Sequence, residues 1–143
     1  MNIYALSSGR GPSGIAIVRI SGKDTLKVCK NLTKLKQINS NEVNYCKFYD
    51  PNNDKIIDPE ALLLWFPGPN SYTGDDLAEF QVHGSNAVIN ALLKALSQQE
   101  NCRLAEPGEF TKIAFQNDKI DLLKAESTCD LIHAETELQR EQA

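Results

Sequence analysis

The stretch GRGPSGIAIVRISG, residues 9–22, decides which class of fold the chain can adopt. Its first six residues match the Gly-x-Gly-x-x-Gly spacing that holds a dinucleotide pyrophosphate, but that motif requires a helix directly after the glycines. Here a run of β-branched and apolar residues follows at 15–20, which is typical of a buried strand. Pro12 also removes one backbone N–H that such a loop would use. We therefore interpret the glycines as a turn between strands at 3–6 and 15–20.

Outside this stretch, strands and helices follow one another in an irregular order. The periodicity of apolar residues predicts strands at 44–49, 61–66 and 77–83, and helices at 24–35, 87–98, 107–116 and 121–143. Several connections between strands are too short for the helical crossover that a parallel pair requires. The sequence therefore predicts an α+β fold with helices packed on a mixed or antiparallel sheet. The last helix ends without a cap, which suggests that its partner helices belong to a longer protein.

The composition is that of a soluble globular protein. The 143 residues are 41% apolar and 24% charged. No run approaches the length of a membrane span, so no membrane partner is expected. The four cysteines are scattered and only two histidines are present, which argues against a zinc site or a disulfide framework. With no presequence at Met1, the expected location is a bacterial cytoplasm rather than a mitochondrion.

The charges are unevenly placed along the chain. The net charge of −4 argues against attraction of nucleic acid over the whole surface, although it permits a local basic patch. One row of lysines recurs at helical spacing in the first helix, at Lys23, Lys27, Lys30 and Lys34. This row is interpreted as a solvated helix face, with a contact to RNA phosphates as the alternative.

Two charged residues stand on strands that otherwise suit the interior of a protein. Arg19 follows Ile15 and Ile17 on one strand face, and Glu79 lies on the strand at 77–83, whose opposite face is apolar. Because an unpaired buried charge costs several kcal/mol, each residue needs a partner or a ligand. Either the two side chains pair with each other across the sheet, or they bind a ligand.

Other candidate catalytic patterns are weak. His83 ends the strand at 77–83, but no nucleophile elbow accompanies it and no second histidine lies at metal-ligand spacing, so a structural role is favoured. Asp75 and Asp76 follow Tyr72 in a stretch typical of a turn. No Gly-x-x-x-x-Gly-Lys-Ser/Thr loop occurs in the sequence, which excludes binding of a nucleoside triphosphate by that route.

Three longer segments resemble a known family: GIAIVRISG at 14–22, FPGPNSYTGDDLAEFQVHG at 66–84 and RLAEPGEFTKIAFQNDKIDLLKAESTCDLIHAET at 103–136. In order and spacing they resemble the N-terminal domain of the MnmE (TrmE) family of tRNA modification GTPases, over nearly the whole chain. The resemblance implies a folate-binding and dimerisation domain at 1–118 and the start of a helical domain at 119–143. It also implies an α+β fold similar to the tetrahydrofolate-binding domain of the glycine-cleavage T-protein.

The resemblance further implies what the full-length protein does. With the FAD-dependent MnmG (GidA) protein, the family adds an aminomethyl-type group to carbon 5 of the wobble uridine of certain tRNAs. The one-carbon unit comes from 5-formyl- or 5,10-methylene-tetrahydrofolate, while GTP, Mg²⁺ and K⁺ belong to a GTPase domain that is not in this sequence. The implied partners are a second copy of the chain, MnmG and tRNA. The fragment alone is not expected to be catalytic.

The family's folate-contacting positions match Arg19, Glu79 and Lys119. One carboxylate can accept both the ring N–H and the exocyclic amine of a pterin, and this is the role expected of Glu79. Arg19 and Lys119 would supply cations for the pterin carbonyl oxygen and for the carboxylates of the glutamate tail. Tyr72 either packs on a flat ring in the same pocket or anchors its loop.

The chain departs from the family pattern at Ile113, where an arginine is common, and at Ser85, where a second glycine usually follows His-Gly. Neither departure touches a folate position, although the missing arginine removes a candidate contact to a partner or to tRNA. Two other functions stay open. One is a dimerisation scaffold in which Arg19 and Glu79 only pair with each other. The other is a self-sufficient folate-dependent one-carbon transferase that uses His83 as its base.

Overall fold

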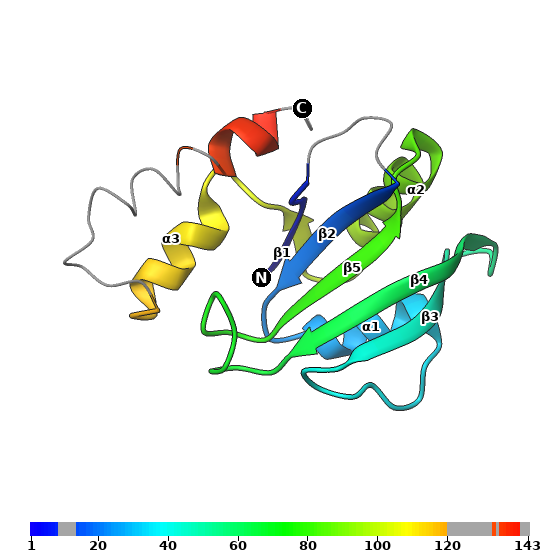
Figure 1. Ribbon diagram of the computed structural model, residues 1–143, viewed down its shortest axis with the longest axis horizontal. Coiled ribbons are helices and arrows are strands. Elements are labelled where there is room, and N and C mark those ends of the chain that lie inside the picture. Colours follow the sequence, from blue (N-terminus) through cyan, green and yellow to red (C-terminus); the bar gives the residue numbers. More distant parts are fainter. Residues whose placement is uncertain (9–13, 120–132, 134, 141–143) are drawn as a thin grey trace.

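The computed structural model describes residues 1–8, 14–119, 133 and 135–140. The elements in this part of the chain are β1 (Asn2–Leu6), β2 (Ile15–Ser21), α1 (Thr25–Thr33), β3 (Val43–Tyr49), β4 (Ile56–Phe66), β5 (Leu77–His83), α2 (Asn86–Ser97), β6 (Cys102–Leu104) and α3 (Glu109–Gln116). The strands form one sheet in the order β3-β4-β5-β2-β1-β6 (Figure 1). Neighbouring strands are antiparallel except β1 and β6, which are parallel. The predicted α+β fold with a mixed sheet is confirmed.

The glycine-rich stretch leads into a strand, as predicted. β2 begins at Ile15, directly after Gly14, and pairs with β1 in an antiparallel ladder that joins Leu6 to Val18. The helix that a dinucleotide loop needs after its glycines is therefore replaced by a central strand. The remaining residues of the turn, 9–13, lie outside the described part of the chain.

Two elements begin two or more residues away from their predicted starts, and one strand was missed. β4 begins at Ile56 rather than at residue 61, because the β3–β4 register shifts around Pro59, and such an irregularity accommodates a proline that cannot donate to the ladder. α3 begins at Glu109 rather than at residue 107, since Gly108 takes a left-handed conformation with φ of 75°. β6 was not predicted at all. Most of the helix predicted at 121–143 lies outside the described residues. In the part that is described, residues 135–140 are helical.

Alternation along the strands divides the sheet into two faces. α1 and α2 cover one face, and the main core fills the space between them and the strands (Figure 1). Val18 of β2, Leu63 of β4 and Phe80 of β5 are each fully buried in this core. No helix in the described part of the chain has the length and apolarity needed to cross a membrane.

A smaller cluster lies on the opposite face of the sheet. There Ile3 and Ala5 of β1 are buried with Phe110 of α3, and Ile113 packs against them. Ile113, one of the two positions at which the sequence departs from the expected family pattern, therefore makes an apolar packing contact. Because α3 packs on β1, the side chains of β2 and β5 that point away from the main core come to lie beside it. Arg19 is one of these side chains.

Candidate functional site

Arg19, Glu79 and Lys119 line one pocket of about 470 Å³ on the face opposite α1 and α2. The pocket is completed by residues from the ends of β4 and β5, from the loop between them, and from the loop after α1: Asn41, Phe66, Asn70, Ser71, Tyr72 and Leu77. Glu79 and Lys119, which follow Arg19 by 60 and 100 residues in the chain, are thus brought to the same site. Tyr72, for which the sequence left both a place in this pocket and a role as loop anchor open, also lines it.

Arg19 and Glu79 are directly opposite each other on β2 and β5. Nη2 of Arg19 donates to Oε1 of Glu79 over 3.3 Å, and the two side chains are 25% and 21% exposed. The cross-strand pair that the sequence left open is therefore formed. It is a single contact rather than the bidentate pairing that arginine and a carboxylate can make. Nε of Arg19 is buried and has no hydrogen-bond partner among the described residues.

Two aromatic rings hold the guanidinium group of Arg19. Its central carbon lies 5.5 Å from the ring centroid of Tyr72 and 5.9 Å from that of Phe110, distances at which cation–π attraction operates. The Tyr72 hydroxyl is in turn 3.0 Å from Oγ1 of Thr111 on α3. Tyr72 therefore acts both as a wall of the pocket and as an anchor of its loop.

The loop between β4 and β5 is fixed to the end of α3. Nδ2 of Asn117 donates to the carbonyl oxygen of Thr73 over 2.8 Å, and Nζ of Lys119 donates to the carbonyl oxygen of Pro69 over 3.0 Å. Lys119 thus places its ammonium group at the rim of the pocket. The cation is held there by a neutral acceptor, which leaves its charge available to an anionic ligand.

The close approach of this loop to α3 depends on Gly74. Its φ is 85°, and a Cβ atom at this position would lie 2.9 Å from Cβ of Asn117. We expect Gly74→Ala to lower the free energy of unfolding by about 1–3 kcal/mol, because the left-handed conformation and the contact both become unfavourable. Thermal unfolding measures this. Gly14→Ala is the control, since its Cβ would meet nothing within 4 Å, and an equal loss in both variants would contradict the prediction.

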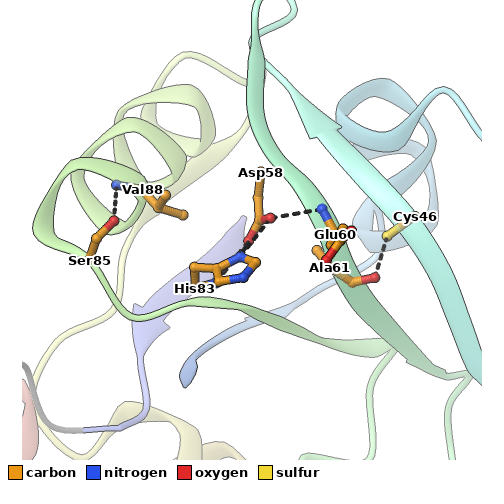
Figure 2. A network of polar contacts seen from close by, with 7 residues as sticks. All are labelled: Cys46, Asp58, Glu60, Ala61, His83, Ser85 and Val88. Atoms are coloured by element: carbon orange, nitrogen blue, oxygen red, sulfur yellow. Dashed lines mark hydrogen bonds and ion pairs between the residues drawn. The ribbon is translucent and has the colours of Figure 1, made fainter. Parts of the chain in front are cut away.

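His83 does not belong to the pocket. It lies four residues beyond Glu79 on β5, which corresponds to about 13 Å along a strand. Figure 2 shows its ring against Asp58 of β4, with Nδ1 2.9 Å from both carboxylate oxygens. Asp58 is 0% exposed and also accepts from the backbone N–H of His83 over 2.8 Å. This contact agrees with the structural role favoured for His83.

The remaining candidates add no second reactive centre. Burial raises the pKa of Cys46 to about 12, so its thiol is a poor nucleophile. No group of three or more potential metal ligands occurs in the described part of the chain. The lysine row is interrupted by acidic side chains: Lys23 and Lys27 line a separate pocket with Asp24 and Glu100, while Lys34 pairs with Asp54 over 3.1 Å.

Sequence reasoning missed the residues that support the pocket. Thr111 and Asn117 hold Tyr72 and Thr73 through side-chain contacts that span about forty residues, and neither forms a local motif. Asp58 was also missed, although an aspartate directly before a proline inside an apolar region is the signal that points to it. Ser85 caps α2, because its side chain accepts from the backbone N–H of Val88.

Comparison with known proteins agrees with these features. The family described as "GTP-binding protein TrmE N-terminus" matches residues 2–119. The tRNA modification GTPase MnmE of Pelagibacter ubique (strain HTCC1062) is 61% identical over 143 residues, 100% of this chain and 32% of that protein. The human protein named 5-taurinomethyluridine-[tRNA] synthase subunit GTPB3, mitochondrial, is 46% identical over 142 residues, 99% of this chain and 29% of that protein. The chain therefore spans about a third of the length of these relatives, and it belongs to the MnmE (TrmE) family, whose N-terminal region it matches.

Proposed function

We propose that the pocket of Arg19, Glu79 and Lys119 binds a formyl- or methylene-tetrahydrofolate. The observation that carries this proposal is the half-buried pair of Arg19 and Glu79 at the wall of the pocket. Their single contact leaves lone pairs on the carboxylate, and Nε of Arg19 has no partner among the described residues. A pterin has neighbouring N–H groups and a carbonyl oxygen, so it can use both kinds of group.

Each side chain then has a separate task. Glu79 accepts the ring N–H and the exocyclic amine of the pterin as a two-point, charge-assisted pair. Arg19, fixed between two rings, donates to an acceptor oxygen of the ligand. Lys119, at the rim, attracts the carboxylates of the glutamate tail. When bound, the folate supplies the one-carbon unit, and the residues of this chain bind it and orient it.

In the full-length protein, this chain would be the folate-binding and dimerisation module of a tRNA modification GTPase. Residues 1–118 form that module, with a fold related to the folate-binding domain of the glycine-cleavage T-protein, and residues 119–143 begin a helical domain. The full-length protein would use GTP, Mg²⁺ and K⁺. Together with the FAD-dependent partner MnmG, it would modify the wobble uridine of tRNA in the bacterial cytoplasm. The names of the relatives support a GTPase activity and a role in tRNA modification. Exposed Val43 and Tyr45 on edge strand β3 support association between copies.

Calorimetric titration of the 143-residue chain with 5-formyltetrahydrofolate tests the binding proposal. We expect one folate per chain and loss of the binding heat in Arg19→Ala, because the variant lacks both the cation and its donors. The variant is first compared with the parent by circular dichroism, so that loss of binding is not confused with loss of fold. A folded parent chain that does not bind folate would instead support the alternative of a dimerisation scaffold, in which Arg19 and Glu79 only pair with each other.

A further inference from the structure

A second pocket adjoins the Arg19 pocket across the ring of Tyr72. It has a volume of about 200 Å³ and lies between β1, α3 and the C-terminal helical residues 135–140, with apolar walls from Phe110 and Leu138. Tyr72 lines both pockets. The guanidinium group of Arg19 lies against the rings of Tyr72 and Phe110. The two pockets are therefore neighbours, and an elongated ligand in the first has the second within reach.

Gln139 places an unused, buried hydrogen-bond donor at the wall of this second pocket. Its side chain lines the pocket, and the residue is 8% exposed. Its Oε1 accepts from the backbone N–H of Gly108 over 2.7 Å, which fixes the orientation of the amide, because only the oxygen can accept. Nε2 is buried and has no partner among the described residues. A donor that has lost its water and gained no acceptor is uncommon in a folded protein and calls for an explanation.

Glu135 places an acceptor beside this donor. It precedes Gln139 by four residues on a helix, so the two side chains are neighbours on one face. Its Oε2 accepts from the backbone N–H of Thr111 over 3.3 Å, and burial raises its pKa although Thr111 and Arg19 oppose that shift. Beyond its hydrogen bonds from Thr111, the carboxylate keeps further lone pairs. The second pocket thus offers a donor and an acceptor side by side between aromatic and aliphatic walls.

We propose that this pocket binds the benzoyl ring and the following amide of the folate whose pterin occupies the Arg19 pocket. The ring packs between the aromatic side chains of α3 and the β4–β5 loop on one side and Leu138 on the other. The carbonyl oxygen of the amide accepts from Nε2 of Gln139, and its N–H donates to Glu135. The proposal rests on the proposed function, and it extends the ligand site to residues beyond the 2–119 region that the family description matches.

Two ligands and two variants test this subsite. The 143-residue chain is titrated with 5-formyltetrahydrofolate and with 5-formyl-6-methyltetrahydropterin, which lacks the benzoyl and glutamate parts. We expect Gln139→Leu to weaken binding of the folate by about tenfold, the effect of one lost hydrogen bond, and to leave binding of the pterin unchanged. Gln139→Glu keeps an acceptor for Gly108 and replaces the donor by a second carboxyl group beside Glu135, so it should show the same selectivity.

The controls separate this proposal from the proposed function. Arg19→Ala should weaken both ligands, whereas Glu137→Gln, on the exposed side of the same helix, should weaken neither. Equal weakening of both ligands in the Gln139 variants would mean that Gln139 only supports α3, and the subsite would be refuted while folate binding stood. An unchanged folate affinity in both Gln139 variants would refute it as well. If the parent chain binds neither ligand, the proposed function itself fails.

Discussion

Glu79→Gln is expected to weaken binding of 5-formyltetrahydrofolate by about 1.5–3 kcal/mol, the usual cost of losing a hydrogen bond to a charged group. Glutamine has one acceptor oxygen in place of two, and its amide donors would face the donors of the pterin and of Arg19. Calorimetric titration at fixed pH measures the difference. The shape of the side chain is preserved, so the change in affinity reports on charge and on donor–acceptor pattern.

The same substitution separates the binding function from a scaffold. The Arg19–Glu79 pair makes a single contact and glutamine keeps an acceptor oxygen for Arg19, so Glu79→Gln should lower the free energy of unfolding by no more than about 1–2 kcal/mol. An exposed substitution of the same type, Glu42→Gln, serves as the control for both measurements. If Glu79→Gln reduced thermal stability and left folate affinity intact, the residue would serve only the sheet, and the scaffold would be the better interpretation.

The central part of the fold could be predicted from the sequence because its signals are local. β5 occupies residues 77–83 as predicted, since Ala78, Phe80 and Val82 alternate with more polar neighbours and face the core. The same alternation placed Arg19 and Glu79 on strand faces and raised the question of their partner. Their pairing and their common pocket with Lys119 then follow from the topology, which puts β2 beside β5.

Other features could not be predicted because they depend on contacts between distant segments. β6 has only three residues, too few to show alternation, and it exists because it pairs with β1 in parallel. The strand predicted at 61–66 in fact begins at Ile56 and passes Pro59 through an irregularity in the β3–β4 ladder. The second pocket needs α3 and residues 135–140 together, and no spacing in the sequence reports that contact.

Asp58→Ala is expected to lower the free energy of unfolding by about 2–5 kcal/mol, because two backbone N–H groups lose their acceptor and each group left unsatisfied costs about 1–3 kcal/mol. In the β4–β5 ladder the pairs run from Leu62 to Phe66, and beyond them the Asp58 carboxylate accepts from the backbone N–H of His83 over 2.8 Å. It also accepts from the backbone N–H of Glu60 over 2.9 Å. The alanine variant leaves both donors without this acceptor. Chemical unfolding monitored by the fluorescence of Trp65 measures the loss.

A double-mutant cycle with His83→Ala identifies which contact matters. The His83 side chain is 56% exposed, so its removal alone should cost about 1 kcal/mol. Because Asp58 serves two backbone groups besides the ring, most of its effect should persist in the double variant. Asp54→Ala, an exposed aspartate that pairs with Lys34, is the control and should cost less than about 1 kcal/mol. A loss of less than about 1 kcal/mol for Asp58→Ala would show that water replaces the carboxylate. Folate affinity should be unchanged in these variants, because His83 lies outside the pocket.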